Sequence, residues 1–301
     1  MKISVITSVF NESIDVIKLC IDSVLNQSIK NFEYIIVDDN PNSLKLYNFL
    51  KREANKDTRI QILRNDTNLG LVKSLNRGLN YSTGDYIARV DADDISKKSR
   101  LENQLEFLKK NKLDFVCSNA KIIDENGETI HTRALGNRKI VSQKIIKFFF
   151  HRANFSVHSS WFVRKKVFQS LHNYRNIDYA EDYDFILRAL QRKIRIGYQP
   201  KIMVSKRIRK DSITKKNAYR QYVTATLLSK NVPPRIIKNE VRILNDSIIN
   251  KVNKLYSLSD TFNKKKSLFI LLKLIVYILS SKKLTIYAIW ILNGKIIRKI
   301  T

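Results

Sequence analysis

The sequence predicts an α/β fold in which a mostly parallel sheet is flanked by helices and followed by a basic helical region. Three observations carry this prediction. Short apolar runs of strand length alternate with runs of helical periodicity over the first ninety or so residues, which is typical of βαβ units. Polar residues follow the strands where they end, as expected of ligand-binding groups in open α/β sheets. The last third of the chain is helical in pattern and rich in lysine and arginine.

The expected elements follow one another along the chain. Strands and helices should alternate over Ile3–Phe10, Ile14–Leu25, Phe32–Val37, Leu44–Ala54, Arg59–Leu63, Gly70–Tyr81 and Tyr86–Val90, beginning with a strand. Beyond Asp211, helical patterns cover Ala218–Ser229, Pro233–Leu258 and the apolar run Leu268–Leu279. We therefore expect one α/β domain over residues 1–210 and a basic helical region over residues 211–301.

The net charge of +29 over 301 residues is unevenly distributed. Residues 204–301 hold 22 lysines and arginines against 4 aspartates and glutamates. Such a surface favours an anionic partner, either a nucleic acid or an anionic membrane. The basic residues flank apolar runs, and no recognition-helix, zinc-ligand or RNA-binding aromatic motif accompanies them. The sequence therefore favours a membrane surface and argues against a nucleic acid.

Cysteine usage and the first residues indicate the compartment. Cys20 and Cys117 lack metal-binding spacing and have apolar neighbours, so we expect buried, reduced thiols. The run Met1–Thr7 is a short strand interrupted by hydroxyl residues, unlike the longer apolar run of a secretory signal. We expect a cytoplasmic protein.

An acidic cluster directly follows the strand Tyr86–Val90. Asp91, Asp93 and Asp94 lie within four residues. Carboxylates at alternate positions of an extended segment, such as Asp91 and Asp93, can converge on one hard divalent cation and leave coordination sites for diphosphate oxygens. The alternative is an ordinary turn, where aspartate is common, followed by a helix that Ser96 or Ser99 could cap together with Glu102.

A nucleotide site at this edge would need side chains to hold phosphates. No glycine-rich phosphate loop follows the first strand, so a metal ion and basic side chains would have to take its place. Arg64, Lys73 and Arg89 are the candidate counter-charges. Their alternative is a solvated place on the surface, where arginine and lysine are most often found.

Several segments, all in the same order, resemble family 2 glycosyltransferases of the bacterial branch that builds capsule, exopolysaccharide and lipopolysaccharide chains. The resemblance covers roughly the first 210 residues and is carried by Ser4–Asn11, Val37–Asn40, Asn68–Leu71, Leu75–Gly78, Gly84–Asp94, Ile95–Gln104, His158–Ser160, Tyr179–Asp184 and Arg207. It implies a Rossmann-like GT-A fold, a nucleotide-sugar donor with uridine diphosphate as the default, a Mg²⁺ or Mn²⁺ ion, and transfer with inversion. A hexosyl or N-acetylhexosaminyl group would be transferred.

The resemblance also implies roles for particular residues. The donor would be bound by Ser8, Val9, Asn11, Asp39, Arg64, Asn68, Gly70, Asn76, Asp91, Ala92, Arg207 and Arg209. Among them, Asp39 would accept a hydrogen bond from the base and Asp91 would face the ribose and sugar. Asp93, with Asp91 beside it, would ligate the metal. A cation fixed against the departing diphosphate stabilises charge where it develops.

The same resemblance makes Asp182 the base that takes the proton of the acceptor hydroxyl, since one carboxylate opposite the leaving group suffices for inverting displacement. Glu181 and His158 would support it on the acceptor side. The alternative is that Glu181, Asp182 and Asp184 only complement the dipole at the start of a helix, an effect of roughly 0.3–1 kcal/mol per charge.

One departure concerns the end of the α/β domain, where the branch commonly has Tyr-Arg-x-His and this chain has Lys206-Arg207-Ile208-Arg209. Arg209 takes the place of the histidine, and an arginine stays protonated and cannot ligate a metal. Arg209 could instead clamp the diphosphate together with Arg207. The alternative is a basic surface near a membrane. An inactive family-like scaffold is a further reading, and a metal-dependent nucleotidyltransferase is another.

The run Leu268–Leu279 is shorter than the roughly 20 apolar residues that a spanning helix needs. Lysines flank it, and the aromatic residues Tyr277, Tyr287 and Trp290 lie in or near it, as in helices that lie in a membrane interface. We therefore expect peripheral attachment to the anionic cytoplasmic leaflet and a lipid-linked acceptor glycan. The alternative is a helical tail that packs on the α/β domain or on a second copy of the chain.

Overall fold

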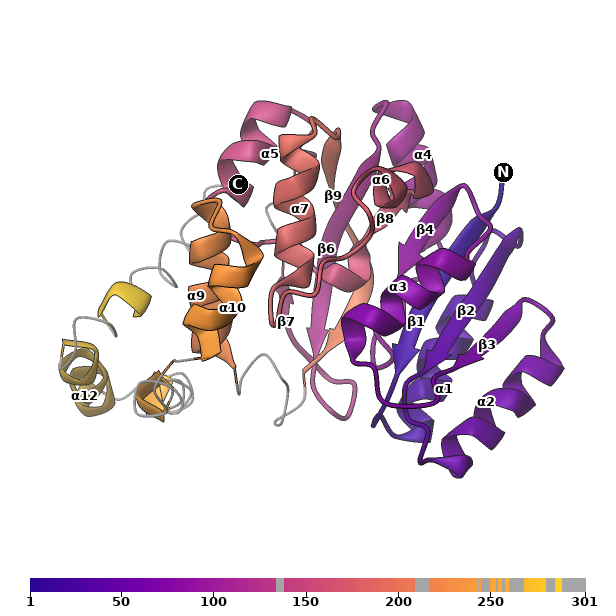
Figure 1. The fold of residues 1–301 in the computed structure, drawn as a ribbon, viewed down its shortest axis with the longest axis horizontal. Helices are drawn as coiled ribbons and strands as arrows, with labels where there is room; N and C mark the ends of the chain where they lie inside the picture. Colours follow the sequence, from indigo (N-terminus) through magenta and orange to yellow (C-terminus); the bar gives the residue numbers. More distant parts are fainter. Residues whose placement is uncertain are drawn as a thin grey trace.

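The computed structural model describes residues 1–133, 138–208, 217–242, 244, 250–252, 254–255, 258–259, 268–279 and 285–288. The strands are β1 (Ile3–Val9), β2 (Phe32–Asp38), β3 (Ile60–Arg64), β4 (Tyr86–Arg89), β5 (Ile95–Ser96), β6 (Phe115–Ile123), β7 (Thr129–Arg133), β8 (Phe162–Arg164) and β9 (Ile196–Arg207). The helices are α1 (Ile14–Leu25), α2 (Leu44–Lys56), α3 (Leu71–Tyr81), α4 (Arg100–Lys110), α5 (Gln143–Phe150), the 3₁₀ turn η1 (His158–Ser160), α6 (Lys165–Ser170), α7 (Glu181–Gln191), α9 (Ala218–Ser229), α10 (Pro234–Arg242) and α12 (Leu268–Leu279). Figure 1 shows their arrangement.

Within the described residues the strands form one nine-stranded sheet in the order β3-β2-β1-β4-β8-β6-β9-β5, with β7 paired to β6. The strands β1 to β4 are mutually parallel, so their carboxyl ends meet at one edge. Strand β8 is antiparallel to β4 and to β6 on either side of it. The short β5 pairs antiparallel with the end of β9, which brings the residues after β4 against the end of β9.

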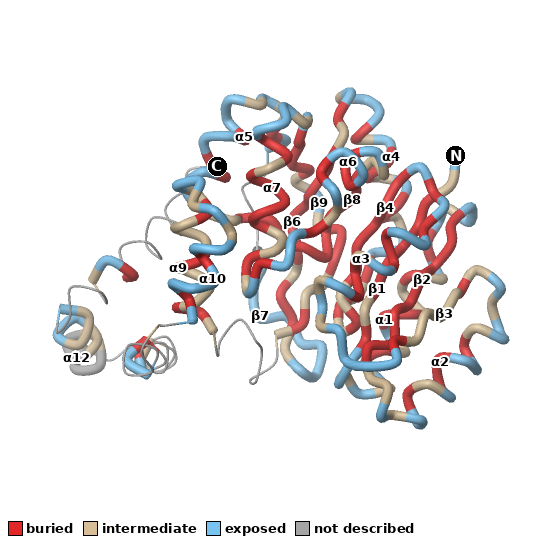
Figure 2. Tube along the Cα trace, in the orientation of Figure 1, coloured by how far each residue is buried: buried red, intermediate tan, exposed pale blue. Residues whose placement is uncertain are grey.

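Helices cover both faces of the sheet, and each face has its own apolar core. Every residue of β2 is buried, as expected of a parallel strand covered on both sides. Figure 2 shows the buried strands between helices whose outer faces are exposed. Helix α3 approaches the sheet closely at Gly78, where a Cβ would meet Ile6 Cγ2 at 2.8 Å and Val37 Cγ2 at 3.3 Å. A larger residue there would push α3 away from the sheet.

The predicted fold class and the predicted elements of the first ninety residues are confirmed, with ends that differ by one or two residues. The predicted buried cysteines are also confirmed. The capping alternative for the acidic turn is wrong. Ser99 precedes α4 without a side-chain cap bond, and Glu102 instead accepts a hydrogen bond from Ser28 Oγ at 2.8 Å.

The single helix expected over Pro233–Leu258 is wrong, because α10 ends at Arg242 and Leu244 lies outside helical structure. The sequence continues as Asn245-Asp246-Ser247, residue types that favour turns over helix interiors. Leu244 is partly buried and packs against two apolar clusters of the C-terminal region.

The C-terminal helices pack onto the α/β domain in two steps. Helices α9 and α10 bury Leu228, Ile237 and Val241 against Tyr183 and Leu187 of α7. Beyond them, partly buried side chains of α12 pack against an aromatic cluster built around Tyr219, Tyr222 and Tyr287. Figure 1 shows α9 and α10 beside α7, with α12 at the far end.

Helix α12 has two different faces. Leu274, Tyr277 and Ile278 pack toward the aromatic cluster, whereas Ile275, Val276 and Leu279 are 44%, 68% and 67% exposed. The packing partly supports the alternative of a tail that docks on the rest of the chain. None of the described helices is long and apolar enough to cross a bilayer.

Candidate active site

The predicted acidic residues come from two places, the carboxyl ends of β2 and β4 and the start of α7, and the other predicted site residues lie on the elements and loops around them. We call Asp91, Asp93 and Asp94 the strand-end cluster, and Glu181 and Asp182 the helix-start pair. Both sets border the end of β9, where Arg207 N donates to Asp94 Oδ1 at 2.9 Å and Lys206 carries a charge that acts on Asp91 and Asp182.

Asp39 organises the loop that follows β3. Its Oδ1 accepts hydrogen bonds from Asn65 Nδ2 at 2.7 Å and Leu69 N at 2.8 Å, and its Oδ2 accepts one from Gly70 N at 2.9 Å. Gly70 has φ of +81°, a left-handed conformation that glycine adopts without penalty. A carboxylate offers about four acceptor positions, so Asp39 keeps roughly one for an incoming donor group after holding the loop.

Residues at the ends of β1 and β2 are joined by Asn40, whose Nδ2 donates to Phe10 O at 2.8 Å and to Asn11 Oδ1 at 3.1 Å. Ser8 is half-buried, whereas Asn11 and Asn68 are exposed, so these three predicted donor-binding residues are accessible.

Two other predicted donor-binding residues are not accessible. The side chains of Val9 and Ala92 are buried in the core. The main-chain carbonyl of Val9 accepts a hydrogen bond from Asp39 N at 2.9 Å. These two residues shape the floor of the site, because core side chains cannot reach a ligand at the sheet edge.

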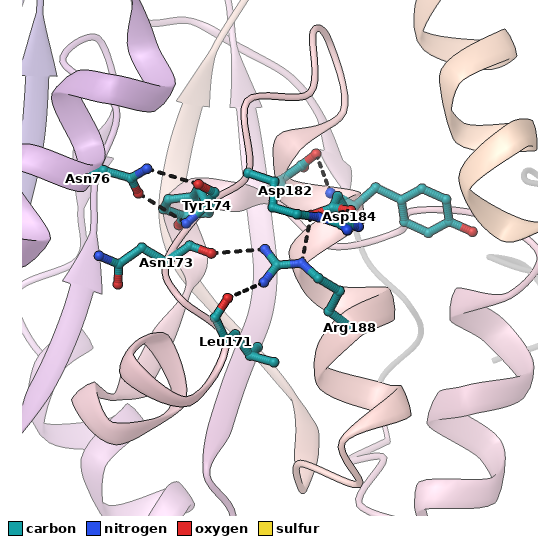
Figure 3. Close-up of polar contacts among 9 residues, drawn as sticks. Asn76, Leu171, Asn173, Tyr174, Asp182, Asp184 and Arg188 are labelled. Atoms are coloured by element: carbon teal, nitrogen blue, oxygen red, sulfur yellow. Dashed lines mark hydrogen bonds and ion pairs between the residues drawn. The ribbon is translucent and has the colours of Figure 1, made fainter. Parts of the chain in front are cut away.

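Arg64 and Asn76 are engaged by the protein itself. Arg64 stacks on the Tyr47 ring, with its guanidinium carbon 4.2 Å from the ring centroid, and donates to Pro41 O at 2.6 Å. Asn76 exchanges two hydrogen bonds with the main chain of Tyr174, at 2.9 and 3.0 Å, as Figure 3 shows. These bonds connect α3 to the loop that precedes α7. Lys73 lies exposed on α3.

The strand-end cluster places one oxygen of each of its three carboxylates within 4.8 Å of the others. Asp91 forms an ion pair with Arg89 and has Ser159 Oγ at 2.7 Å from its Oδ2. The same hydroxyl also contacts Asp94 Oδ2. One hydroxyl proton can be donated to only one carboxylate at a time, so the cluster carries more negative charge than its donors neutralise.

The pKa values of the cluster express this imbalance. Burial raises the pKa of Asp94 to about 7, and the charge of Asp91 adds to the effect. Burial acts on Asp91 as well, but the Arg89 guanidinium outweighs it and holds the pKa of Asp91 below its usual range. Three convergent carboxylate oxygens suit Mg²⁺ or Mn²⁺, which prefer oxygen ligands. Asp94, which the sequence motif contains but the predicted ligand set omitted, belongs to the group.

Two predicted phosphate-binding arginines are interior residues. The surface alternative for Arg89 is wrong, because Arg89 is buried and bonded to Asp91 and Ser159. Arg207 donates from its guanidinium to the carbonyls of Asp93 at 3.2 Å, Asp124 at 3.0 Å and Glu125 at 2.8 Å. Arg207 therefore fixes the loop that carries the cluster. The predicted role of Arg209 falls outside the described residues.

The three acidic residues in the first turn of α7 have different environments. Asp184 is buried between two arginines, Arg175 at 3.1 Å and Arg188 at 2.8 Å, and Arg188 also donates to the Leu171 and Asn173 carbonyls (Figure 3). Asp184 is a structural residue. Asp182, in contrast, has no ion pair among the described residues.

The carboxylate of Asp182 is held by two neutral donors. Its Oδ2 accepts from Asn154 Nδ2 at 2.8 Å, and its Oδ1 accepts from Tyr183 N at 2.7 Å. Asn154 Oδ1 in turn accepts from Ser156 Oγ at 2.9 Å, and this hydroxyl accepts from Trp161 Nε1 at 3.2 Å. The chain of bonds fixes which end of the Asn154 amide faces Asp182. No motif in the sequence singles out Asn154.

Glu181 and His158 lie next to each other, with His158 Nδ1 at 3.9 Å from Glu181 Oε1. Burial raises the pKa of Glu181 to about 8, and the neighbouring charge of Asp182 adds to it. Burial likewise raises the pKa of Asp182. Burial and the charge of Arg89 hold the pKa of His158 well below its usual range, so His158 is neutral, and its Nε2 is hydrogen-bonded to Tyr174 OH at 2.7 Å.

Comparison with known proteins places these features in context. The family described as Glycosyl transferase family 2 matches residues 4–171. An uncharacterized glycosyltransferase of Methanocaldococcus jannaschii is 36% identical over 189 residues, which is 62% of this chain and 64% of that protein. The O-antigen biosynthesis glycosyltransferase WbnJ of Escherichia coli is 31% identical over 216 residues, covering 70% of this chain and 81% of WbnJ.

A solved structure shares the fold. The chain is similar to S. aureus TarS residues 1–349 in complex with UDP-GlcNAc, with a TM-score of 0.60 and 17% identity over 92% of this chain and 80% of that one. At this identity the likeness concerns the fold, and it agrees with the GT-A type of α/β sheet.

Proposed function

The chain belongs to glycosyltransferase family 2, and from this premise we propose that it transfers a sugar, with inversion, from a nucleotide-diphosphate sugar to a hydroxyl of a growing surface glycan. Uridine diphosphate is the proposed nucleotide, and a hexosyl or N-acetylhexosaminyl group the proposed sugar. The observation that carries the proposal is the pairing of the strand-end cluster with Asp182, a half-buried carboxylate held by neutral donors. This arrangement suits a leaving diphosphate on one side and a base on the other.

In the proposed reaction Asp182 accepts the proton of the acceptor hydroxyl, and the oxygen of that hydroxyl attacks the anomeric carbon of the donor sugar. The bond from that carbon to the diphosphate breaks, and the electron pair leaves with the nucleotide diphosphate. Asn154 Nδ2 and Tyr183 N orient the carboxylate, and burial raises its pKa toward the range where a base is most effective near neutral pH. Glu181 and neutral His158 border the place of the acceptor.

The strand-end cluster would hold a Mg²⁺ or Mn²⁺ ion through Asp93 and Asp91, with Asp94 beside them. Such an ion, when bound, supplies positive charge for the departing diphosphate. The chain itself contributes the fixed position of the carboxylates, through Arg89, Ser159 and the main-chain amide of Arg207.

The experiment that tests the function is a screen of nucleotide sugars for release of the nucleotide diphosphate, with Mn²⁺ or Mg²⁺ present or chelated. Wild type is compared with Asp93→Ala and Asp182→Asn. Metal-dependent release from one donor that both variants abolish or strongly reduce would establish the function and name the sugar. If the wild type neither releases nor binds any donor in calorimetry, the chain is an inactive scaffold of the family.

A peripheral membrane role and a lipid-linked acceptor are part of the proposal. Support comes from the apolar face of α12 formed by Ile275, Val276 and Leu279, in a region with a large excess of lysine and arginine. Apolar contact together with attraction to anionic headgroups is how interfacial helices bind membranes. The protein would then work on the cytoplasmic face of the cell membrane.

Vesicle sedimentation tests this part. The double variant Val276→Ser, Leu279→Ser should bind vesicles containing phosphatidylglycerol several-fold more weakly than wild type, since about two apolar side chains no longer enter the interface. Leu19→Ser, which alters an exposed apolar residue on α1, is the matched control. Equal binding by all three proteins, or no binding by wild type, would contradict the membrane role.

A further inference from the structure

Among the described residues, the arginines at the site are already engaged, which raises the question of which side chain binds the donor diphosphate. Five carboxyl groups surround the site, those of the strand-end cluster and the helix-start pair. Three of the arginines that the sequence suggested are engaged within the protein: Arg64 with Tyr47 and Pro41, Arg89 with Asp91, and Arg207 with main-chain carbonyls. The fourth, Arg209, lies outside the described residues. A diphosphate adds further negative charge to this place, so another cation is needed.

Lys206 stands on the face of β9 that borders the site. In the regular part of the β6–β9 ladder, Ala120 pairs with Val204 and Ile122 pairs with Lys206. Val204 packs with Ala120 against Val157, the residue before η1. Because side chains two apart in a strand lie on the same face, Lys206 lies on the Val157 side, one step closer to the strand end. Arg207 points to the opposite face and fixes the loop of the cluster.

The position of Lys206 lets its charge act on both parts of the site. It lowers the pKa values of Asp91 and Asp94 on one side, and those of Asp182 and His158 on the other. Within the described part of the chain, Lys206 forms no ion pair, and it is half-buried. A lysine that lies near several carboxylates, and forms an ion pair with none of the described ones, can bind an anion that enters between them.

We propose that Lys206 binds the diphosphate of the substrate, at the boundary between the strand-end cluster and the helix-start pair. The inference rests on the proposed function. An ammonium group is a compact point charge that binds phosphate without a fixed orientation, and its three donors can follow the diphosphate as charge accumulates on departure.

The test compares Lys206→Met, which keeps the length of the side chain and removes its charge, with Lys206→Arg, which keeps the charge. Lys201→Met is the matched control, because Lys201 lies exposed on the same strand and donates to Asn103 Oδ1 at 2.8 Å. Calorimetry measures UDP and uridine binding to each protein, with Mn²⁺ present and with metal chelated, at low and high salt. If the donor screen selects another base, its diphosphate and nucleoside replace these two ligands.

We expect Lys206→Met to weaken UDP binding about tenfold, as for loss of a charge-assisted hydrogen bond, and to leave uridine binding unchanged. The salt dependence of UDP binding should decrease, and Lys206→Arg should restore most of the affinity. Equal losses for UDP and uridine would overturn the proposal, because the lysine would then act on the structure of the site.

Two diphosphates take part in the proposed reaction, that of the donor and that of a lipid-linked acceptor. Weakened UDP binding assigns Lys206 to the donor. Unchanged UDP binding together with a raised KM for a diphospholipid acceptor, but not for the same glycan without diphosphate, assigns it to the acceptor. Unchanged values in both assays overturn the proposal while the function stands, whereas a wild type that binds no nucleoside diphosphate overturns both.

Discussion

The strand-end cluster and the helix-start pair are built from the same residue types but are stabilised in opposite ways. Asp91 of the cluster faces the Arg89 guanidinium, which keeps it ionised. Glu181 of the pair is buried beside another carboxylate, which favours its protonated form. Environment, and not residue type, therefore decides whether a carboxyl group holds a charge or exchanges a proton.

The difference follows from which basic and hydrogen-bonding groups lie near the carboxylates of each set. The cluster follows a central strand, so the neighbouring strands and η1 deliver Arg89, Ser159 and the amide of Arg207 to it. The pair begins a helix, where Asn154 and the Tyr183 amide are the hydrogen-bond donors to Asp182. In the same first turn, Asp184 is neutralised by Arg175 and Arg188, so this acid has a structural role.

The largest expected effect is on the rate of sugar transfer when Asp182, the proposed base at the start of α7, is replaced. Asp182→Asn should reduce the rate of sugar transfer by about 10²–10⁴, the usual contribution of a general base, and leave UDP binding unchanged. Steady-state kinetics and calorimetry measure the two quantities. Asp178→Asn, an exposed residue just before the helix, is the control. A transfer rate within threefold of wild type would remove Asp182 from the reaction and break the comparison.

The next effect concerns the cluster. Asp93→Ala should abolish stimulation by Mn²⁺ and reduce the rate in its presence by about a hundredfold or more, since a metal ion contributes several kcal/mol to charge stabilisation. Rates are measured over a metal titration, and Asp66→Ala, an exposed acid in the loop after β3, serves as control. Full activity of wild type in excess chelator would show that the cluster acts without a metal.

A smaller effect is expected on the pH dependence of kcat when Asn154, a donor to Asp182, is replaced. Removing a donor from a carboxylate raises its pKa, so Asn154→Ala should shift the acid limb of the kcat profile upward by roughly one to two pH units, the equivalent of a hydrogen bond to a charged group. Activity should fall about tenfold below the limb and recover at high pH. Asn111→Ala, outside the site, should leave the profile in place. A uniform loss at every pH would point to a packing role instead.

The smallest effect is on stability. The pKa of Glu181 is raised from 4.5 to about 8 on folding, so the folded state binds the proton more tightly than the unfolded state. The contribution of Glu181 to stability is then fully present below about 4.5 and is lost as pH rises through about 8.

Replacing this residue tests the sign. Glu181→Gln cannot ionise, so its free energy of unfolding relative to wild type should increase between pH 5 and pH 8, by roughly 1–3 kcal/mol for relief of a buried charge. Chemical denaturation with metal chelated measures it at both pH values. Glu106→Gln, an exposed residue on α4, should show no such trend. A difference that does not change with pH would mean that Glu181 titrates normally.

Much of the fold could be predicted, because strand and helix periodicities are local properties of the sequence. The alternation up to β4 and the acidic residues at its end are of this kind, and so are the bounds of α9 and α12. The helix expected through Leu258 was wrong, since α10 ends at Arg242 and Leu244 packs against two apolar clusters, a tertiary contact that the local pattern does not encode.

The candidate site could be predicted only in part. The motifs located Asp39, Asp93 and Asp182, since these residues stand at strand ends or at a helix start. They did not locate Asn154, which contacts Asp182 across 28 positions of sequence. They also did not show that Arg89 and Arg207 are engaged inside the protein, whereas Lys206 forms no ion pair with a described residue. Whether a lysine or arginine forms an ion pair with a carboxylate depends on neighbouring residues that come from distant elements.

The sequence by itself determined the alternating α/β order, the family, and the placement of carboxylates at the end of a central strand and at the start of a helix. Tertiary structure alone decided which acids are ionised, which basic groups are already paired, and which face of β9 borders the site. The physical reason is that periodicity and chain order are written locally, whereas burial, charge pairing and pKa depend on groups that only folding brings together.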